Sequence, residues 1–307
     1  MNAEANSAPQ SLAREARVAV RTVPWTEAFY WCVRRELWEH RAVYIGPLAA
    51  AGVFLFGFLI SLFHLPNRMR EALVDPSKMK SLGTSYEFAA AAIMMVAAIV
   101  QIFYCLDALQ GERKDRSILF WKSLPVSDLT TVLSKASIPF VILPALAYGA
   151  VVVTAFVMLV LSSVVLGLSG LSAAPLWTQL SLLQGAVLLL YHMITVHILW
   201  YAPIICWLLL ISAWARRAAL LWAVLPPFCV GILEKLVFNT SHFAMWIQYR
   251  FSGGMEAETV PGTMPMNPMT RLTPGHFLLT PGLWLGWVVA AICLALAVRI
   301  RRNREPN

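Results

Sequence analysis

The chain has 307 residues, of which 59% are hydrophobic and only 13% are charged, with a net charge of +8 and a mean hydropathy of +0.67. Soluble domains carry about 25% charged residues, so this composition excludes an ordinary soluble protein and predicts an integral membrane protein. A nucleic-acid-binding domain is also excluded, because no soluble segment interleaves basic residues with aromatic or base-reading ones.

The N-terminal residues 1–24 are polar and predict a cytoplasmic tail. No apolar core followed by a cleavage site occurs there, so we expect no removable signal peptide. Residues 25–41 then show helical periodicity, with an apolar arc that includes Val33 and Leu37. Glu36 and Glu39 fall near that arc and make the amphipathic pattern imperfect.

Tryptophans and flanking arginines are typical of a helix that lies in the membrane interface. We therefore expect residues 25–41 to form an interfacial connecting helix, and an extended start of the first span is the alternative. The aromatic residues that would define its membrane-facing character are Trp25, Phe29, Trp31 and Trp38.

Six apolar segments follow, each of spanning length or close to it. About 20 residues at ~1.5 Å per residue cross the ~30 Å hydrocarbon core. The sequence therefore predicts an all-α domain of six transmembrane helices over residues 42–299, followed by a cytoplasmic tail over 300–307. The expected spans are residues 43–65, 88–109, 138–161, 191–211, 218–238 and 282–298.

The connections between these spans are less regular. Residues 66–87 and 239–281 read as external loops. Residues 177–190 fit either an external interfacial helix or the upper part of a tilted fourth span. Pro139 and Pro144 predict kinks in the third span, and Pro226 and Pro227 must interrupt the hydrogen-bond ladder of the fifth.

The distribution of basic residues predicts the orientation. Of the 24 Lys and Arg residues, 17 fall on one side if the N-terminus is cytoplasmic: six before the first span, five between the second and third, two after the fourth and four after the sixth. Cytoplasmic loops carry such an excess, so both termini are expected in the cytoplasm.

The loop over residues 110–136 carries the densest charge in the chain and is expected to be cytoplasmic. A charged entry is followed by an apolar patch and then by Ser127 and Asp128, which suit an N-cap and the first turn of a helix. An apolar patch within a charged loop fits either lipid headgroups or a groove on a partner protein.

The ordered pattern Glu112-Arg113, Ser117-Ile118-Leu119 and Leu124-Pro125-Val126-Ser127, with a later Lys135, resembles the first cytoplasmic loop of ABC-2 type ABC-transporter permeases. The resemblance implies a coupling helix that docks on an ATPase subunit, a second permease copy and a short re-entrant helix near residues 241–249. Under it, the residues expected to couple to the ATPase are Glu112, Arg113, Arg116, Ile118, Phe120, Trp121 and Leu124.

No GxxxxGK[ST] motif occurs, so ATP and Mg²⁺ would be held by the partner ATPase and not by this chain. No GxSxG, HExxH, CxxC or paired-carboxylate pattern indicates an enzyme, and we expect no catalytic residue and no cofactor. The five scattered cysteines are expected to be packing residues.

Three further groups are weaker candidates. Glu234 and Lys235, with the nearby Pro226 and Pro227, could line a transport pathway, although helix-end charges more often reach the headgroups. The methionines Met264, Met266 and Met269 could present soft ligands to Cu(I), but Met also fills apolar contacts. His192 and His197 lie five residues apart and should face different sides of an ideal α-helix.

The sequence thus predicts a permease subunit of an ABC-2 type transporter in a bacterial inner membrane. Its partners would be an ABC ATPase, a second permease copy and the bilayer, with no nucleic acid. The apolar pathway suits export of a lipid, an amphipathic drug or a peptide. An ATP-independent secondary transporter and a membrane accessory protein are the alternatives; the former usually has intramembrane acid or His relays and inverted repeats.

Overall fold

The computed structural model describes residues 24–75, 78–114, 126–251 and 274–303. These residues are about 90% helical, and none of them forms a strand. Six helical stretches are long and apolar enough to cross a membrane, which confirms the prediction of a multi-pass, all-helical protein. They are Ala42–Val74, Ser81–Lys114, Asp128–Leu168, Ala174–Trp200, Ala219–Phe238 and Pro281–Asn303.

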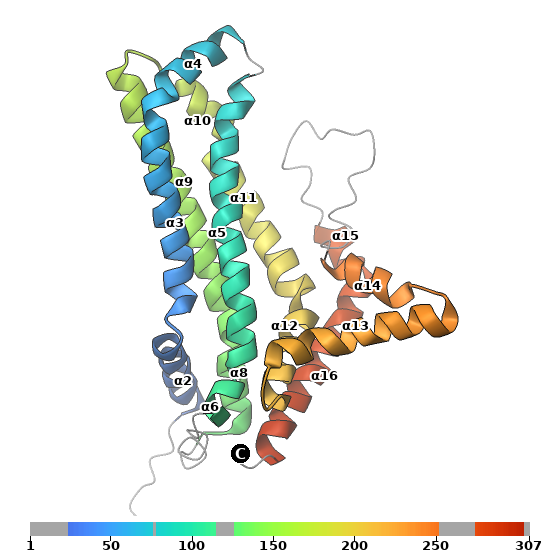
Figure 1. Ribbon diagram of the computed structural model, residues 1–307. Coiled ribbons are helices and arrows are strands. Elements are labelled where there is room, and N and C mark those ends of the chain that lie inside the picture. Colours follow the sequence, from blue (N-terminus) through green and yellow to red (C-terminus); the bar gives the residue numbers. More distant parts are fainter. Residues whose placement is uncertain (1–23, 76–77, 115–125, 252–273, 304–307) are drawn as a thin grey trace, which may run out of the picture.

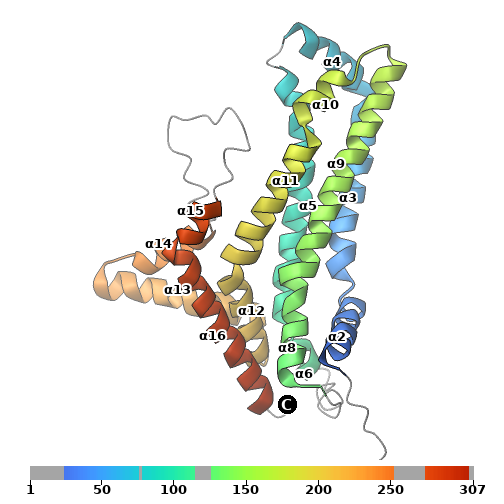
Figure 2. The same cartoon turned by 180° about the vertical axis from the view of Figure 1, so that it is seen from behind.

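Three long helices form the main bundle: α3 (Ala42–Ser61), α5 (Met79–Asp107) and α9 (Leu143–Leu168). They run side by side in both views (Figures 1 and 2). At one end lie α4 (Leu65–Val74) and α10 (Ala174–Leu180). At the other end, here called the base, lie α2 (Trp25–Glu39), α6 (Gln110–Lys114) and α8 (Asp128–Ser137).

The first connection differs from the prediction of a loop over residues 66–87. A short 3₁₀ turn, η1 (Leu62–His64), leads directly into α4, and α5 already begins at Met79. Most of the described part of this segment is therefore helical. Met69 and Ala72 of α4 are buried against the end of the bundle, which explains why the segment does not extend into solvent as a loop.

The prolines of the third span act as predicted, by altering the helix locally. A five-residue π-helical segment, η3 (Ile138–Ile142), separates α8 from α9. The carbonyl of Lys135 accepts from the N–H of Ile138 and, at 3.2 Å, from the Tyr104 hydroxyl. The carbonyl of Pro139 accepts from Nε2 of Gln101 at 3.1 Å. Side chains of α5 thus donate to backbone carbonyls near the prolines, as a nonpolar surrounding favours.

The fourth spanning stretch, Ala174–Trp200, lies earlier in the chain than the predicted residues 191–211. It consists of α10, a break at Ser181, α11 (Leu182–His192) and the π-helical η4 (Met193–Trp200), and the shorter apolar helix α12 (Ala202–Trp214) follows it. Of the two readings of residues 177–190, the upper part of the fourth span fits residues 182–190, which lie in α11. The last helix, α16 (Pro281–Asn303), packs along α12 and ends at the base.

Two helices project away from the rest. In both views the axis of α13 (Ala219–Phe238) makes a steep angle with the axes of α5 and α9 (Figures 1 and 2). The next helix in the chain is α14 (His242–Phe251). The length and composition of α13 suit a span, but its direction differs from that of the other five candidates. Pro226 and Pro227 lie within α13, which runs continuously through both.

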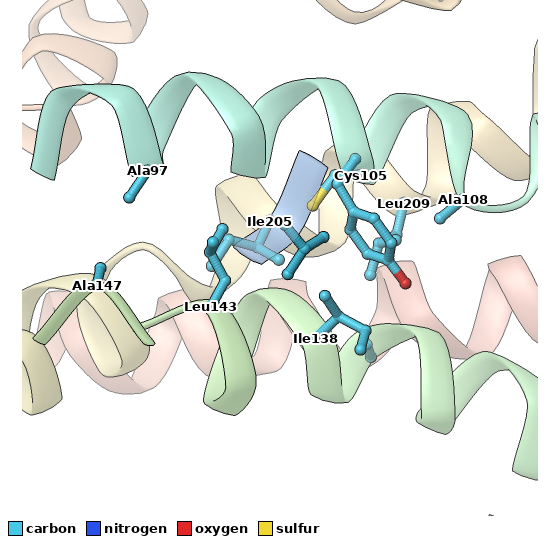
Figure 3. Close-up of a cluster of buried hydrophobic side chains, with 11 residues drawn as sticks. Ala97, Cys105, Ala108, Ile138, Leu143, Ala147, Ile205 and Leu209 are labelled. Carbon is cyan, nitrogen blue, oxygen red and sulfur yellow. The ribbon is translucent and has the colours of Figure 1, made fainter. Parts of the chain in front are cut away.

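One large buried cluster lies where α5, η3, α9 and α12 meet (Figure 3). Small residues allow the helices to approach closely, as at Ala97 and Ala147. Between α3 and α5 the contact is so close that a Cβ on Gly46 would lie 2.8 Å from Cγ2 of Val100. This packing holds the base end of α5, and with it α6, in a fixed position.

Candidate functional site

A set of charged side chains lies at the base, where α2, α6, α8 and α16 meet, and four of the six are buried. We call it the base cluster. Its members lie far apart in the sequence. Each stands on a helix that also packs apolar residues against the bundle, and this packing directs the charged side chain toward the interior. The base cluster consists of Arg35 and Glu36 of α2, Glu112 of α6, Asp128 and Lys135 of α8, and Arg301 of α16.

The pair at its centre is Glu36 with Lys135, whose Oε1 and Nζ atoms lie 2.5 Å apart. The two side chains are 0% and 1% exposed. Oε2 of Glu36 accepts from the Tyr104 hydroxyl at 3.2 Å. Burial alone would raise the pKa of Glu36, but the charge and hydrogen bond of Lys135, together with Arg35, outweigh it and hold the pKa below its ordinary value.

Glu112 contacts three cations. Its Oε1 lies 2.7 Å from Nη2 of Arg35 and 3.1 Å from Nζ of Lys135, and its Oε2 lies 2.5 Å from Nη1 of Arg301. Arg301 also reaches Oδ1 of Asp128 through Nε at 3.2 Å. The base cluster thus contains three carboxylates and three cations, so its formal charges balance.

Local capping places α8 for these contacts. Ser127 is the N-cap of α8, and its hydroxyl accepts from the Thr130 N–H at 3.1 Å, which confirms the predicted helix start. Asp128 occupies the first turn, as expected. Nε1 of Trp25 donates to Oγ1 of Thr130 at 3.1 Å, so the beginnings of α2 and α8 are joined as well.

Arg113 is turned inward and caps another helix. Its Nη2 donates to the carbonyls of Ser212 and Ala215 at 2.5 and 2.8 Å, at the C-terminal end of α12. The Ser212 hydroxyl accepts in return from the N–H groups of Leu109 and Gln110. Glu112 and Arg113 are 6% and 7% exposed, so the charged groups of both residues are engaged inside the protein and do not form an open rim.

The other residues expected to couple to an ATPase, namely Arg116, Ile118, Phe120, Trp121 and Leu124, lie outside the described residues. What the structure describes is the chain on either side of them. Glu112 precedes this segment and Asp128 follows it, and both belong to the base cluster.

The aromatic residues of α2 divide between two faces. Trp25 and Phe29 stack on one another with ring centroids 5.3 Å apart. Trp31 and Trp38 are 53% and 67% exposed, and the Arg34 guanidinium lies about 5 Å from the ring centroid of each. The opposite face carries Glu36.

The weaker candidates are placed as follows. The carboxylate of Glu234 accepts from Oγ1 of Thr240 and from the N–H groups of His242 and Phe243 at 2.7–2.8 Å, so it caps the start of α14. Lys235 is exposed, and Pro226 and Pro227 are half-buried within α13. Met264, Met266 and Met269 lie outside the described residues.

One group in the described chain has ligand atoms close enough to hold a metal ion: Glu36, Glu39 and His40. Its central carboxylate is already bound by Lys135, Arg35 and Tyr104, so a cation would have to displace these partners. We therefore assign the Glu36 carboxylate to the base cluster and not to a metal site.

The prediction that His192 and His197 face different sides is wrong. Their ring centroids lie 5.5 Å apart because η4 is π-helical. An α-helix has 3.6 residues per turn, whereas π-helical hydrogen bonding joins residues five apart and brings them onto one face. The His197 ring also contacts that of Tyr201, at 5.8 Å.

Of the base cluster, sequence reasoning predicted only Glu112 as a site residue. It missed the other five in that role: Arg35, Glu36, Asp128, Lys135 and Arg301. The sequence did contain a signal for Glu36, because this acidic residue interrupts the apolar arc of its helix. Arg301 had none, because it stands among Arg299, Arg302 and Arg304 at the end of a span, where basic residues are expected anyway.

Fold and site together define a multi-pass helical protein with an ionic cluster at one end of its bundle. Comparison of the chain with protein-family models, curated proteins and solved structures finds no match.

Proposed function

We propose that the chain is the membrane-spanning permease subunit of an ABC-2 type ABC transporter. The observation that supports this most is the base cluster. It connects both flanks of the segment over residues 115–125 to the N-terminal helix and to the last helix of the bundle. A coupling segment needs such connections, because a displacement at the surface has to reach helices that line a pathway.

In this proposal the segment over 115–125 docks in a groove of the ATPase subunit. Phe120, Trp121 and Leu124 would form the apolar plug, with Arg116 beside it, while Glu112 and Arg113 anchor the segment to the protein interior. ATP and Mg²⁺ are bound by the ATPase alone. Closure of the ATPase pair displaces the segment, and the base cluster passes the displacement to α2, α8 and α16, so that the helices alternate between inward and outward access.

The α2 helix takes the role of the interfacial connecting helix. Its exposed face carries Trp31 and Trp38 with Arg34 between them, and this combination suits the headgroup region. Its inward face reaches Lys135 through Glu36. The base is then the cytoplasmic side of a bacterial inner membrane, with both chain ends on that side.

A second permease copy completes the pathway. The α13 helix is apolar apart from Glu234 and Lys235 near its end, and residues such as Phe228 (63% exposed) and Leu236 (79% exposed) are left uncovered by the described chain. A helix of this kind is normally buried. Lipid and a second copy are the surroundings that fit. The cargo class that suits such a pathway is a lipid, an amphipathic drug or a peptide.

One observation favours the alternative of an ATP-independent secondary transporter. Secondary transporters use intramembrane ionisable residues, and the paired imidazoles of His192 and His197 lie within a candidate span. No GxxxxGK[ST] motif is needed in either case, so the presence of an ATPase partner distinguishes the two.

The test is a docking variant, Trp121→Asp with Leu124→Asp, purified in mild detergent from cells that also produce the candidate ATPase. Two carboxylates in an apolar groove should abolish co-purification of the ATPase. The matched control, Leu73→Asp with Val74→Asp at the exposed end of α4, which lies at the end of the bundle opposite the base, should retain it. Unchanged co-purification with the docking variant would overturn the assignment.

A further inference from the structure

Two neighbouring arginines of α2 have opposite surroundings. Arg35 contacts the carboxylates of Glu36, Glu39 and Glu112, so its charge is balanced within the protein. Arg34 is exposed, and none of the described carboxylates forms an ion pair with it. The positive charge of Arg34 therefore has no counter-charge in the described part of the chain.

Two tryptophans hold the Arg34 guanidinium in place. Its Cζ atom lies 5.1 Å from the ring centroid of Trp31 and 5.0 Å from that of Trp38. The three residues stand three and four positions apart, which places their side chains on one face of the helix. Cation–π attraction acts through the faces of the rings and uses none of the guanidinium N–H groups as donors to an acceptor atom. Those N–H groups therefore stay available to an acceptor from the surroundings.

The other acidic residues of α2 do not supply that acceptor. Glu39 contacts Arg35, at 3.4 Å. Glu36 belongs to the base cluster. Glu27 stands seven residues before Arg34, about 10 Å away along the helix axis. An anion that balances Arg34 therefore has to come from outside this helix.

The position of α2 identifies the source of such an anion. In both views α2 lies at the edge of the base, and it packs inward against α8 (Figures 1 and 2). Indole rings favour the level of the lipid headgroups, where an apolar ring meets the acyl chains and its N–H meets water. Trp31 and Trp38 are both more than half exposed, so they suit this level. The acceptors that a membrane offers there are the phosphate oxygens of lipids.

We infer that Arg34, Trp31 and Trp38 form a binding site for the headgroup of an anionic phospholipid. The guanidinium of Arg34 donates to the phosphate oxygens, and the two indoles contact the glycerol and the upper part of the acyl chains. The assignment to the inner leaflet rests on the proposed function, because that function places the base on the cytoplasmic side. The binding itself requires no ATPase.

The same chemistry makes the site selective. A guanidinium group can bind phosphate through two parallel N–H···O bonds, which adds geometry to charge. Phosphatidylcholine carries its own cation beside the phosphate, and Arg34 repels that cation and already occupies the indole faces that would attract it. Phosphatidylglycerol has no such cation. The site should therefore prefer phosphatidylglycerol to phosphatidylcholine.

Lipid binding to the purified chain in detergent tests this directly. Dioleoyl phosphatidylglycerol or dioleoyl phosphatidylcholine is added, and the lipid-bound fractions are compared by native mass spectrometry. Wild type should bind the first phosphatidylglycerol about fivefold more tightly than phosphatidylcholine, the factor expected for one basic residue at an anionic surface. Arg34→Gln should remove this preference and leave the affinity for phosphatidylcholine unchanged.

The matched control is Arg217→Gln. Arg217 is also exposed and follows α12, which ends at the base, but it lacks a pair of indole rings within the described chain. This variant removes the same charge and should keep the preference. Absence of a preference in wild type, an unaltered preference in Arg34→Gln, or equal losses in both variants would overturn the site.

Two further arms test its chemistry. Arg34→Lys keeps the charge without the planar fork and should lose only part of the preference, whereas Trp31→Leu with Trp38→Leu should weaken the binding of both lipids. Glycerol phosphate, which has the phosphate but no acyl chains, should not compete at tenfold excess over the lipid. Effective competition would show a site for a free anion and overturn the lipid assignment.

The outcome is separable from that of the proposed function. Selective binding by a chain that recovers no ATPase would sink the permease assignment and leave the headgroup site standing. An ATPase recovered with a chain that lacks the preference would leave the permease assignment standing and overturn the headgroup site.

Discussion

Nζ of Lys135 lies 2.5 Å from Oε1 of Glu36, a residue 99 positions earlier in the chain, and both side chains are almost fully buried. The contact joins α2 to α8 at the base. Glu112 lies 3.1 Å from the same ammonium group and connects it to Arg301.

Breaking the central pair should strongly destabilise the protein. Removing one partner of a buried ion pair leaves an uncompensated charge and typically costs about 3–5 kcal/mol. We expect Lys135→Met to lower the free energy of unfolding by about that amount, measured by denaturant unfolding in detergent micelles. The double variant Glu36→Met with Lys135→Met should recover most of the loss.

The matched control is Glu39→Gln, also on α2. The side chain of Glu39 is 44% exposed, so its contact with Arg35 should contribute at most about 1 kcal/mol. The importance of the buried pair would be contradicted if the Lys135 variant were no less stable than the Glu39 variant.

Stability should fall in acid in a way that depends on Glu36. The pKa of Glu36 is lower in the folded protein than its ordinary value of 4.5, so the stabilisation it provides is present above that value and is lost as the pH falls through the folded pKa. The difference in Tm between wild type and Glu36→Gln should therefore be largest near neutral pH and shrink below about pH 4.5. A difference independent of pH would show that the pKa of Glu36 is the same in the folded and unfolded states, which contradicts the account.

The π-helical segment predicts a specific cross-link. In a cysteine-free background, cysteines at positions 192 and 197 should be joined by a short thiol-reactive bridge, because η4 brings His192 and His197 onto one face. Cysteines at Leu183 and Leu188 have the same spacing within the α-helical α11 and should not be joined. Equal yields for both pairs would argue against a π-helical η4.

Gly286 should tolerate no side chain. A Cβ there would lie 2.5–2.8 Å from the guanidinium atoms of Arg250, which stacks at 4.4 Å on Trp200 and donates to its carbonyl. Overpacking of this kind typically costs about 1–3 kcal/mol, so Gly286→Ala should lower thermal stability. Gly149→Ala, where a Cβ meets nothing within 4 Å, should be neutral or slightly stabilising. The same Tm for both variants would contradict the close contact.

Much of the fold could be predicted because the helices are apolar over whole spanning lengths. Periodicity could not predict the π-helical η4, since its hydrogen bonding changes the residue spacing only locally. An ideal α-helix therefore places His192 and His197 on different sides, whereas η4 brings their rings together. The steep direction of α13 was equally unpredictable, because its orientation depends on packing with distant elements.

The base cluster illustrates the same limit at the site. Ser127 and Asp128 were predicted at the start of α8 because capping is local in sequence. Apart from Arg35 of its own helix, the hydrogen-bond partners of Glu36 come from two other helices, Tyr104 from α5 and Lys135 from α8, and no single-segment pattern relates them. The useful signal was that Glu36 lies on the apolar side of its helix. An acidic residue in such a position predicts a buried cation opposite it.

The central claim is that this chain works with a separate ATPase, and affinity purification in mild detergent tests it most directly. The tagged full-length chain is isolated from its own membranes, and the proteins that accompany it are identified and quantified by mass spectrometry. The account predicts a P-loop ATPase in equal amount with the chain. Recovery of the chain alone, or only with further copies of itself, would contradict it.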